Sequence, residues 1–554
     1  MSSRTTLPAA VPPIASDITE PAPTARGDLV IGHLLEAGIA RAPDQVIVDA
    51  DGKRMSYREL GDRVRRLAAG LHSFGVRAGQ TVAMMDWDSH RYLEVYFAVP
   101  MIGAVLHTVN VRLSPEQLAY TINHARDDLI VFNAEFLPMV EEIHDRLEPG
   151  TRLVLHGEGG RPATTLPIET DYERLIEGGD PSFVFPHLAE DTRATTFYTT
   201  GTTGLPKGVH FTHRQLVLHA LVLASVLDGA WQGGGEDIYM PITPMFHVHA
   251  WGMPYVATMR GLKQVYPGRY HPGRLLDLIR DEGVTLSHCV PTILQSLLTQ
   301  AHQRPSRLDG WKVFIGGAAL SQSLVAEALE LGADIRAGYG MSESGPLLAV
   351  AQPSPRMRAA PLEEQLAWRS KAGRPVPFVS LRIVDAAMND VAPGATGEIV
   401  VRAPWLTTDY VGDAESSERL WAGGWMHTGD IGLLDGDGVL NVTDRLKDVI
   451  KTGGEWISSL ALEDLIGRHA GVREVAVIGV SDPKWTERPL AVVVPREGVA
   501  VDAAALQTHL GAFAASGAIP RYGVPDRFVF VDSLPRTSIG KVDKKVLRAR
   551  YDPA

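Results

Sequence analysis

The first half of the chain alternates between helix-like and strand-like runs of hydrophobic residues. The segment Ser56-Tyr57-Arg58-Glu59 has the pattern of a capping box, which begins a helix. One apolar face of that helix follows at helical spacing, formed by Leu60, Val64, Leu67, Ala68 and Leu71. Continuous apolar runs predict strands at residues 81–85, 104–109, 129–132 and 152–155, and again at 313–315 and 335–339. This alternation is typical of parallel βαβ layers, so the predicted fold class is α/β.

The hydrophobic pattern changes twice in the second half of the chain. Between about residues 378 and 441, short alternating runs lie between Gly, Pro and Asp turns, which predicts a small antiparallel β unit. After Lys451 a mixed region follows, with a helix expected at 459–466 and strands at 475–480, 490–494 and 527–531. The charged segment 444–448 lies between two apolar runs, and we place a domain boundary there.

Composition narrows the class of protein. The chain has 554 residues and a net charge of −12, which argues against a general nucleic-acid-binding protein. It lacks a run of 18 apolar residues, so no membrane span is predicted, and its Pro- and Ala-rich start is expected to be a disordered leader rather than a secretion signal. A cytoplasmic location is therefore expected. The single cysteine, Cys289, has apolar neighbours that predict a buried thiol without a catalytic role.

The most informative segment spans residues 195–210 and is rich in glycines and hydroxyl groups. Its chemistry is carried by Thr199, Thr200, Gly201, Thr202, Thr203, Gly204, Lys207 and Gly208. Glycines let backbone N–H groups crowd around an anion, and hydroxyls and a lysine add donors and charge, so the composition suits a triphosphate. The ordinary P-loop needs Ser or Thr after its lysine, whereas Gly208 follows Lys207 here and Pro206 precedes it. We therefore expect a loop rather than a helix-anchored cradle.

Three shorter motifs supply groups that suit a nucleotide. Tyr339, between two glycines, suits a purine ring, and Glu343, four residues later, suits Mg²⁺; the alternative is a strand end with a core tyrosine. Asp430 in a Gly-flanked turn can accept hydrogen bonds from a ribose, although an Asx turn would look the same. Lys541 follows Gly540 in a polar loop and could deliver a cation to developing negative charge, although isolated lysines are usually solvated.

Residues 244–251 combine Met, Phe, Trp and two histidines. His247 and His249 could bind zinc, but no glutamate-flanked protease pattern or cysteine partner accompanies them. Met245, Phe246 and Trp251 instead favour the wall of an apolar binding tunnel.

Taken in order, these motifs resemble those of the adenylate-forming superfamily, which includes acyl-CoA synthetases, peptide-synthetase adenylation domains and firefly luciferase. The resemblance runs from about residue 35 to residue 547, and residues 246–251 and 451–459 are most similar to bacterial fatty-acyl-CoA synthetases. It implies a disordered leader (1–28), a large N-terminal adenylation domain of βαβ layers with a small β-rich subdomain (29–444), a hinge (445–448) and a small, mobile α+β C-terminal domain (449–554). The implied activity is acid–CoA ligation in two steps through an acyl-adenylate, with a medium- to long-chain fatty acid as the expected substrate.

The resemblance also implies residue roles. The catalytic group would be Lys541, Lys207 and Glu343, with Mg²⁺ held by Thr199 and Glu343. ATP and AMP would be bound by Thr199, Thr200, Gly201, Thr202, Thr203, Gly204, Lys207, Gly317, Ala318, Gly338, Tyr339, Gly340, Met341, Ser342, Asp430, Arg445, Lys447, Lys451, Trp456 and Lys541. The acyl group would lie against His247, Val248, Trp251, Gly316 and Gly317. Coenzyme A would meet Gly453, Gly454 and Glu455, and Lys447 would be the hinge residue.

Alternatives to this reading remain open. The substrate could be a short, branched, alicyclic or aromatic acid, and the enzyme could load a carrier protein in place of CoA. A nucleotide-sensing module would bind ATP without acid-dependent chemistry. A serine hydrolase is disfavoured, because residues 340–344 do not complete the Gly-x-Ser-x-Gly motif. A homodimer is expected only by analogy with relatives.

Overall fold

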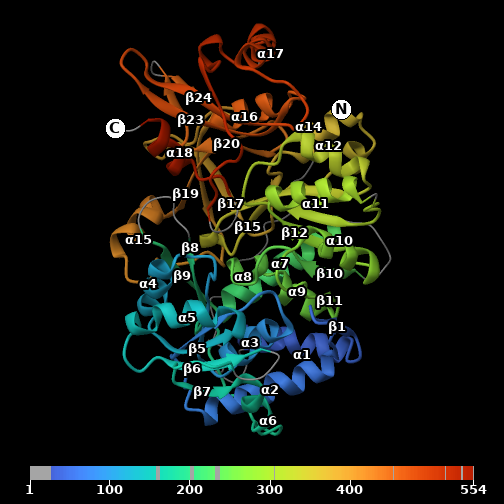
Figure 1. Ribbon diagram of the computed structural model, residues 1–554, viewed down its shortest axis with the longest axis vertical. Helices are drawn as coiled ribbons and strands as arrows, with labels where there is room; N and C mark the ends of the chain where they lie inside the picture. Colours follow the sequence, from blue (N-terminus) through green and yellow to red (C-terminus); the bar gives the residue numbers. More distant parts are fainter. Residues whose placement is uncertain are drawn as a thin grey trace, which may run out of the picture.

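The computed structural model describes residues 27–157, 162–199, 205–230, 237–304, 306–452, 455–517, 519–537 and 541–552; for residues 228–230, 455 and 456 it describes the backbone alone. Among these residues the strands form four sheets, three in the large N-terminal part and one in a smaller C-terminal domain (Figure 1). No helix among the described residues is long and apolar enough to cross a membrane.

The first large sheet is mostly parallel and contains the early strands that the sequence predicts. Its order is β7 (Ile168–Asp171), β6 (Arg152–His156), β5 (Asp127–Asn133), β3 (Thr81–Met85), β4 (Val105–Thr108), β8 (Arg193–Thr199) and β9 (Lys207–Thr212). Strands β3, β4, β5 and β6 pair in parallel, as the alternating pattern predicts. Strand β9 alone runs antiparallel to its neighbour β8.

The second large sheet combines strands from both halves of the N-terminal part. Its order is β16 (Arg374–Pro375), β15 (Leu347–Val350), β14 (Asp334–Gly340), β13 (Lys312–Ile315), β12 (Leu286–Cys289), β10 (Ile238–Pro241), β11 (Lys263–Val265), β1 (Val46–Val48) and β2 (Arg54–Ser56). Strands β10, β12, β13 and β14 are parallel. Their carboxyl ends therefore meet at one edge, where α/β sheets bind their ligands.

Helices cover the two sheets and bury two hydrophobic clusters. The bounds are α1 (Gly32–Arg41), α2 (Tyr57–Ser73), α3 (His90–Met101), α4 (Pro115–Ala125), α5 (Leu137–Ile143), α6 (Tyr172–Glu177), α7 (His213–Ala230), α9 (Met253–Arg260), α10 (Pro272–Asp281), α11 (Pro291–Gln303), α12 (Gln322–Glu330), α13 (Pro355–Arg358) and α14 (Leu362–Arg369). Helix α2 begins with the predicted capping box at Ser56 and Glu59, and its predicted apolar face is buried. All residues of α3 are buried, because α3 packs between α2 and the strands.

The third sheet confirms the predicted antiparallel unit. It consists of β17 (Ser380–Val384), β18 (Gly397–Arg402), β19 (Met426–Leu434) and β20 (Leu440–Arg445), with α15 (Ala414–Leu420) inserted before β19. All its pairings are antiparallel. Strand β20 extends to Arg445, so the sheet reaches into the predicted boundary segment.

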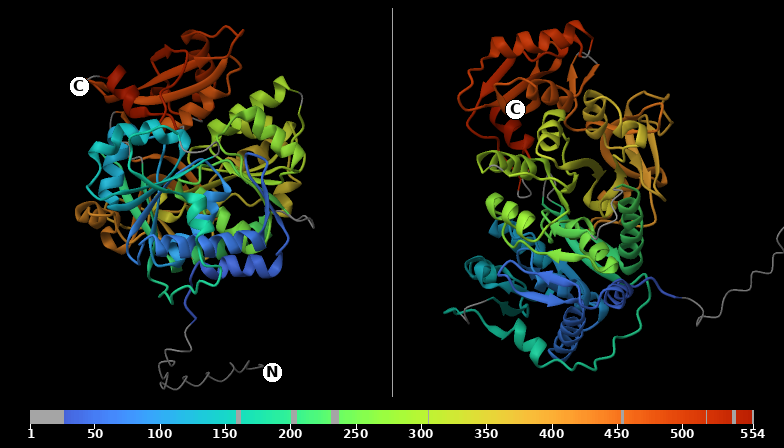
Figure 2. Two further views of the ribbon diagram at one scale, coloured as in Figure 1. Left: turned by 60° about the horizontal axis from the view of Figure 1, so that its bottom comes forward. Right: turned by 90° about the vertical axis from the view of Figure 1, so that its right-hand side faces the viewer.

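The C-terminal domain has its own sheet and its own hydrophobic clusters. Its elements are β21 (Ile450–Thr452), β22 (Glu455–Ile457), α16 (Ser459–Gly467), β23 (Val472–Asp482), β24 (Thr486–Pro495), α17 (Ala503–Ala515), β25 (Arg527–Phe530) and α18 (Lys544–Tyr551). Two apolar clusters, one on each face of this sheet, are formed by residues from Ile450 onward. The domain lies beside the N-terminal part as a separate lobe (Figure 2). The α/β fold with a large and a small domain is thus confirmed.

Candidate active site

The carboxyl ends of β13 and β14 bring two predicted glycine segments together. Ile315 at the end of β13 pairs with Ala337 of β14, so Gly316–Gly317, which follow β13, lie beside Gly338–Tyr339, which continue in β14 and pair with β15. Gly340 has no space for a side chain, because a Cβ there would lie 1.4 Å from the Pro346 carbonyl oxygen. This close approach explains why the end of β14 needs glycine at this position. Gly317 and Ala318, which follow β13, are exposed.

The predicted phosphate segment lies in a β-hairpin. Strand β8 ends at Thr199 and β9 begins at Lys207, and these two residues are directly opposite each other. A strand rather than a helix follows the lysine, in agreement with the reading that this is not a P-loop. The predicted ligands Thr200, Gly201, Thr202, Thr203 and Gly204 lie outside the described residues.

Lys207 is held by groups that the sequence motifs do not identify. Its ammonium lies 2.5 Å from the Ser416 hydroxyl oxygen and 3.6 Å from a carboxylate oxygen of Asp413. It also lies 4.7 Å from the centre of the Tyr410 ring, a cation–π contact. The lysine is only partly buried, at 36% side-chain exposure, so its charge remains accessible from the site.

Glu343 sits in a short 3-10 turn, η4 (Ser342–Ser344), just beyond β14. Its side chain is buried, and one carboxylate oxygen accepts a hydrogen bond of 2.7 Å from the Tyr410 hydroxyl. Burial raises the pKa of Glu343, and the hydrogen bond from Tyr410 opposes that rise. Tyr410 thus contacts both Lys207 and Glu343.

Tyr339, Asp430 and Arg445 form one connected group. Asp430 of β19 lies opposite Arg445 of β20, with 3.3 Å between the guanidinium and the carboxylate. The second oxygen of Asp430 accepts a hydrogen bond of 2.8 Å from the Tyr339 hydroxyl. The sequence predicts all three residues for the nucleotide, and the structure brings them together. The hydrogen bond also orients the Tyr339 ring, which the flanking glycines alone do not.

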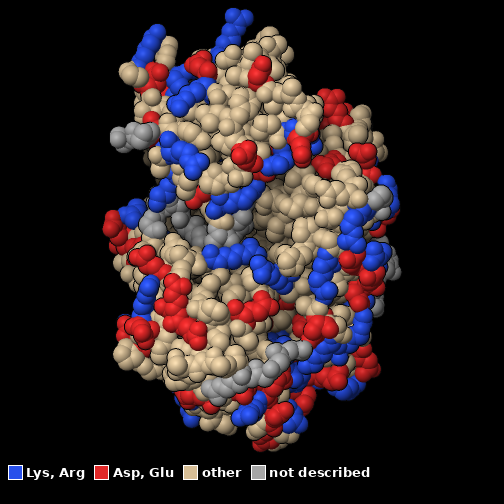
Figure 3. Space-filling view, viewed as in Figure 1, with Lys and Arg blue, Asp and Glu red and all other residues tan. Residues whose placement is uncertain are grey.

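Lys541 reaches this group from the C-terminal domain. A methyl group built on Gly317 would lie 3.4 Å from Lys541 Cε and 3.7 Å from Nζ. Burial lowers the pKa of Lys541 to about 8; Arg445 and Lys447 lower it further, whereas Asp430 and Glu343 oppose the shift. Lys and Arg side chains gather around a hollow below the C-terminal domain (Figure 3), in a chain whose net charge is −12.

The segment predicted to contact the acyl group adopts an unusual backbone. Val248, His249, Ala250 and Trp251, the turn α8 (Val248–Trp251), have φ of 49°, 52°, 46° and 59°. Left-handed helical geometry costs non-glycine residues roughly 1–2 kcal/mol each. The preceding residues are anchored, since Met245 N–H donates to Asp88 (2.8 Å) and Thr108 donates to the Phe246 carbonyl (3.0 Å).

Trp251 lies against His288 and Gly316. Its ring centre is 5.1 Å from that of His288 at the end of β12, and a Cβ on Gly316 would lie 3.0 Å from the indole. Gly316 therefore makes room for Trp251. His247 is close enough to Lys541 for the lysine's charge to act on it: burial, Lys541 and Arg112 together lower the pKa of His247 to about 3, so His247 is neutral. The apolar tunnel itself stays a prediction.

The residues predicted for coenzyme A lie in the C-terminal hairpin of β21 and β22. Gly453 and Gly454 are outside the described residues, and so are the side chains of Glu455 and Trp456. Lys451 is exposed, and its backbone N–H donates to Glu487 within the same domain. Their roles, and that of Lys447 as the hinge, stay predictions.

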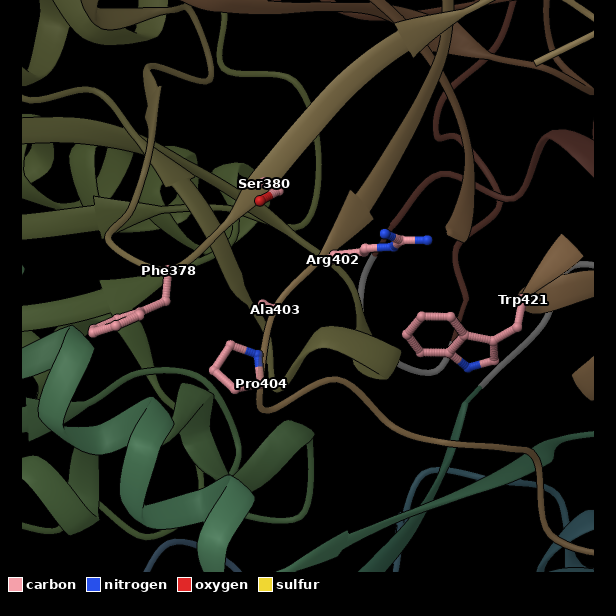
Figure 4. Close-up of a pocket in the computed structure, with 6 residues that line it drawn as sticks. All are labelled: Phe378, Ser380, Arg402, Ala403, Pro404 and Trp421. Atoms are coloured by element: carbon pink, nitrogen blue, oxygen red, sulfur yellow. The ribbon is translucent and has the colours of Figure 1, made fainter. Parts of the chain in front are cut away.

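Among the described residues, one cavity is lined by no predicted site residue and another includes Lys207. The larger, of about 380 Å³, is open and lies beside β17 and β18 (Figure 4). It is lined by Phe378, Ser380, Arg402, Ala403, Pro404 and Trp421. None of these is a predicted site residue. The smaller cavity, of about 200 Å³, reaches Lys207 from the side of α4.

The donor set fits Mg²⁺ in chemistry. Glu343 supplies a buried carboxylate and Thr199 a hydroxyl, which are hard oxygen donors of the kind this ion prefers. Thr199 lies across the hairpin from Lys207, whose Tyr410 neighbour contacts Glu343. The strand pairing of Thr199 with Lys207 and the side-chain contacts of Tyr410 thus place the two predicted ligands in one region.

Sequence reasoning missed Tyr410, Asp413, Ser416 and His288. No motif carried them, because each acts across a long sequence separation: Tyr410 and Glu343 are 67 residues apart. The run from Asp409 to Asp413, which ends in a glycine and an aspartate before a helix, was the available signal.

The chain is similar to known protein families and proteins over most of its length. The model of the family described as AMP-binding enzyme matches residues 35–411, and that of the AMP-binding enzyme C-terminal domain matches residues 461–541. A long-chain-fatty-acid–CoA ligase of Thermus thermophilus is 41% identical over 503 residues, which cover 90% of each chain. A 3-methylmercaptopropionyl-CoA ligase of Ruegeria lacuscaerulensis is 41% identical over 517 residues, 92% of this chain and 94% of that one.

Solved structures show the same architecture. The crystal structure of ATP-bound MatB from Rhodopseudomonas palustris has a TM-score of 0.82 and 25% identity, and covers 95% of this chain and 99% of that chain. A two-domain adenylating enzyme is thus the class that the fold defines. The chain belongs to the AMP-binding enzyme family, which confirms the predicted resemblance.

Proposed function

We propose that this protein is an ATP-dependent, AMP-forming acid–CoA ligase. The observation that carries the proposal is the approach of Lys541 to Gly317, beside the Asp430–Arg445 pair and Glu343. Lys541 of the C-terminal domain thereby comes close to groups of the N-terminal part, among them Arg445, Asp430 and Glu343. Relatives that are 41% identical and carry CoA-ligase names support the same reaction class.

In the first half-reaction, the carboxylate of the acid attacks the α-phosphorus of ATP and pyrophosphate leaves. Both reactants are anions, so much of the barrier is electrostatic repulsion. Lys541 would lie against the carboxylate and α-phosphate, and Lys207 against the β- and γ-phosphates. Asp430 and Arg445 would hold the ribose, and Tyr339 the adenine. Mg²⁺, held by Thr199 and Glu343, would neutralise phosphate charge when bound.

In the second half-reaction, the CoA thiol attacks the acyl carbon of the adenylate, the thioester forms and AMP leaves. We infer that the C-terminal domain turns about Lys447 between the two steps, which would withdraw Lys541 and present the β21–β22 hairpin. Closure in the first step would also keep water from the mixed anhydride.

For the acid, we propose a medium- to long-chain fatty acid. The Thermus relative and a 35% identical medium-chain-fatty-acid–CoA ligase of Ectopseudomonas oleovorans support this choice. A short sulfur-containing acid is the second candidate, because a relative with equal identity is named for 3-methylmercaptopropionate.

The test has two parts. Acid-dependent exchange of labelled pyrophosphate into ATP is expected, and AMP release should rise when CoA is added. A panel of straight, branched, sulfur-containing and aromatic acids, compared by kcat/KM, then identifies the substrate class. ATP binding without acid-dependent exchange would indicate a nucleotide-sensing module, and AMP release that needs a carrier protein instead of CoA would indicate the carrier-loading alternative.

A further inference from the structure

The segment Thr407–Asp413 joins two parts of the site that lie far apart in sequence. At its start, Thr407 N–H donates to the backbone carbonyl of Glu343 (2.9 Å). Further along, Val411 N–H donates to the carbonyl of Gly208 (2.9 Å), next to Lys207. The segment is therefore fixed by its backbone to both the turn of Glu343 and the base of the phosphate hairpin.

Tyr410 lies in the middle of this segment, and its side chain repeats the connection. The hydroxyl donates to Glu343 (2.7 Å), and the face of the ring lies 4.7 Å from the Lys207 ammonium. The backbone N–H of Tyr410 donates to the Ser417 hydroxyl (2.9 Å), which fixes the residue against α15. The two contacts use different parts of one side chain, the hydroxyl and the ring face, so the hydroxyl contact can be removed while the ring contact is kept.

The remaining contacts of Lys207 come from the same region. Asp413 caps α15 through Ser416 N–H (3.0 Å), and both Asp413 and Ser416 contact the ammonium. Lys207 is thus aligned by three groups within seven residues of each other in sequence. A general packing role for Tyr410 would require neither the hydroxyl contact nor the ring orientation.

We propose that Tyr410 is a positioning residue for adenylate formation, whose ring aligns Lys207 for the phosphates and whose hydroxyl aligns Glu343 for the metal. This inference rests on the proposed function. It assigns to one side chain the geometric link between the two halves of the triphosphate site. The Tyr410→Phe variant removes only the hydroxyl, and Tyr410→Leu removes the hydroxyl and the ring face.

The experiment measures binding rather than turnover. ATP affinity is measured by equilibrium dialysis in EDTA, and the affinity of Mn²⁺, a paramagnetic substitute for Mg²⁺, is measured on the enzyme–ATP complex by electron paramagnetic resonance. For Tyr410→Phe, metal-free ATP affinity should change less than twofold. Mn²⁺ affinity should fall about tenfold, the scale of one lost hydrogen bond to a charged group. For Tyr410→Leu, ATP affinity should also fall about threefold to fivefold, as for a lost cation–π contact.

Tyr120→Phe is the matched control. Tyr120 lines the same cavity as Lys207 and stacks on His124, with ring centres 5.2 Å apart. Its substitution should alter neither affinity. If Tyr410→Phe leaves Mn²⁺ affinity unchanged, or if Tyr410→Phe and Tyr410→Leu weaken both ligands alike, the positioning role is wrong. If Tyr410→Leu does not fold, Tyr410→Phe decides the question alone. Absence of acid-dependent exchange in the unaltered protein would instead overturn the proposed function, and the two failures are distinguishable.

Discussion

Lys541 of the C-terminal domain packs against Gly317 of the N-terminal domain, where a methyl group would lie 3.4 Å from Cε and 3.7 Å from Nζ. Gly317 has a φ of 81° and follows β13, so it presents an open backbone to the incoming lysine. The contact places the charge of Lys541 where Asp430, Arg445 and Glu343 act on its pKa. This arrangement suits the first half-reaction, in which the lysine is needed.

Replacing Lys541 with alanine should separate the two half-reactions. Loss of this preorganised cation is expected to slow adenylate formation by roughly 10²–10⁴-fold. Conversion of supplied acyl-adenylate and CoA to thioester should remain within about a factor of ten. Pyrophosphate exchange and a thioester assay measure the two steps, and equal damage to both would contradict the proposed domain rotation.

The rate of the first step should depend on pH through the protonation of Lys541. Burial lowers its pKa to about 8, so the charged form in the free enzyme is lost as the pH rises through 8. The kcat/KM for ATP in pyrophosphate exchange should then fall about tenfold per pH unit above that value. Bound phosphates favour the charged lysine, so kcat should hold to higher pH. The thioester-forming step should not show this fall in rate above pH 8. If both steps show it, Lys541 is not its cause.

Local rules in the sequence predicted much of the fold. Ser56 and Glu59 can form the capping box because they lie three residues apart in sequence. Strands β3 and β5 are mostly apolar because both faces of a parallel sheet are covered. The order of motifs also predicted that Tyr339, Asp430 and Arg445 share a site, and the structure places the three side chains in contact, with Asp430 between the other two.

Other features depend on contacts that sequence spacing cannot show. The left-handed turn at Val248–Trp251 has no glycine within it, so no local preference indicates it, and distant residues such as Asp88 and Thr108 hold the segment before it. Tyr410 lies within the run Asp409–Asp413, but that run does not show that Glu343 and Lys207 contact its side chain, which only the folded structure reveals.

Gly340 and Gly338, both at the end of β14, offer a paired test of how closely the backbone packs there. A Cβ on Gly340 would lie 1.4 Å from the Pro346 carbonyl oxygen, whereas one on Gly338 would meet its nearest atom at 3.7 Å. Gly340→Ala must displace the backbone, and we expect a loss of at least about 3 kcal/mol or failure to accumulate as folded protein. Gly338→Ala should cost about 1 kcal/mol or less. Thermal unfolding of both variants checks this, and equal stability would show that the Pro346 turn yields easily.

Asp88 should make the stability of the N-terminal domain depend on pH. Its buried carboxylate accepts hydrogen bonds from Met245 N–H and the Tyr270 hydroxyl. Burial raises its pKa to about 7; these hydrogen bonds and Arg112 oppose the rise, and Asp86 adds to it. An unfolded aspartate titrates near pH 3.9. The protonated folded form therefore contributes stability that is fully present below about pH 3.9 and is lost as the pH rises through 7.

Asp88→Asn removes this titration while keeping an acceptor for the Met245 N–H. Between pH 5 and pH 8, the free energy of unfolding of the variant should rise by about 2–3 kcal/mol relative to that of the unaltered protein. This figure is about 1.36 kcal/mol per pH unit over the interval from pH 5 to about pH 7, where Asp88 ionises in the folded protein. Melting temperatures of both proteins across this range measure the change. Asp44→Asn is the control, since the Asp44 side chain is 84% exposed and its substitution should give a difference that stays constant with pH. A constant difference for Asp88→Asn as well would show that Asp88 is ionised in the folded protein throughout the range, with Tyr270, Met245 and Arg112 sufficient to offset its burial.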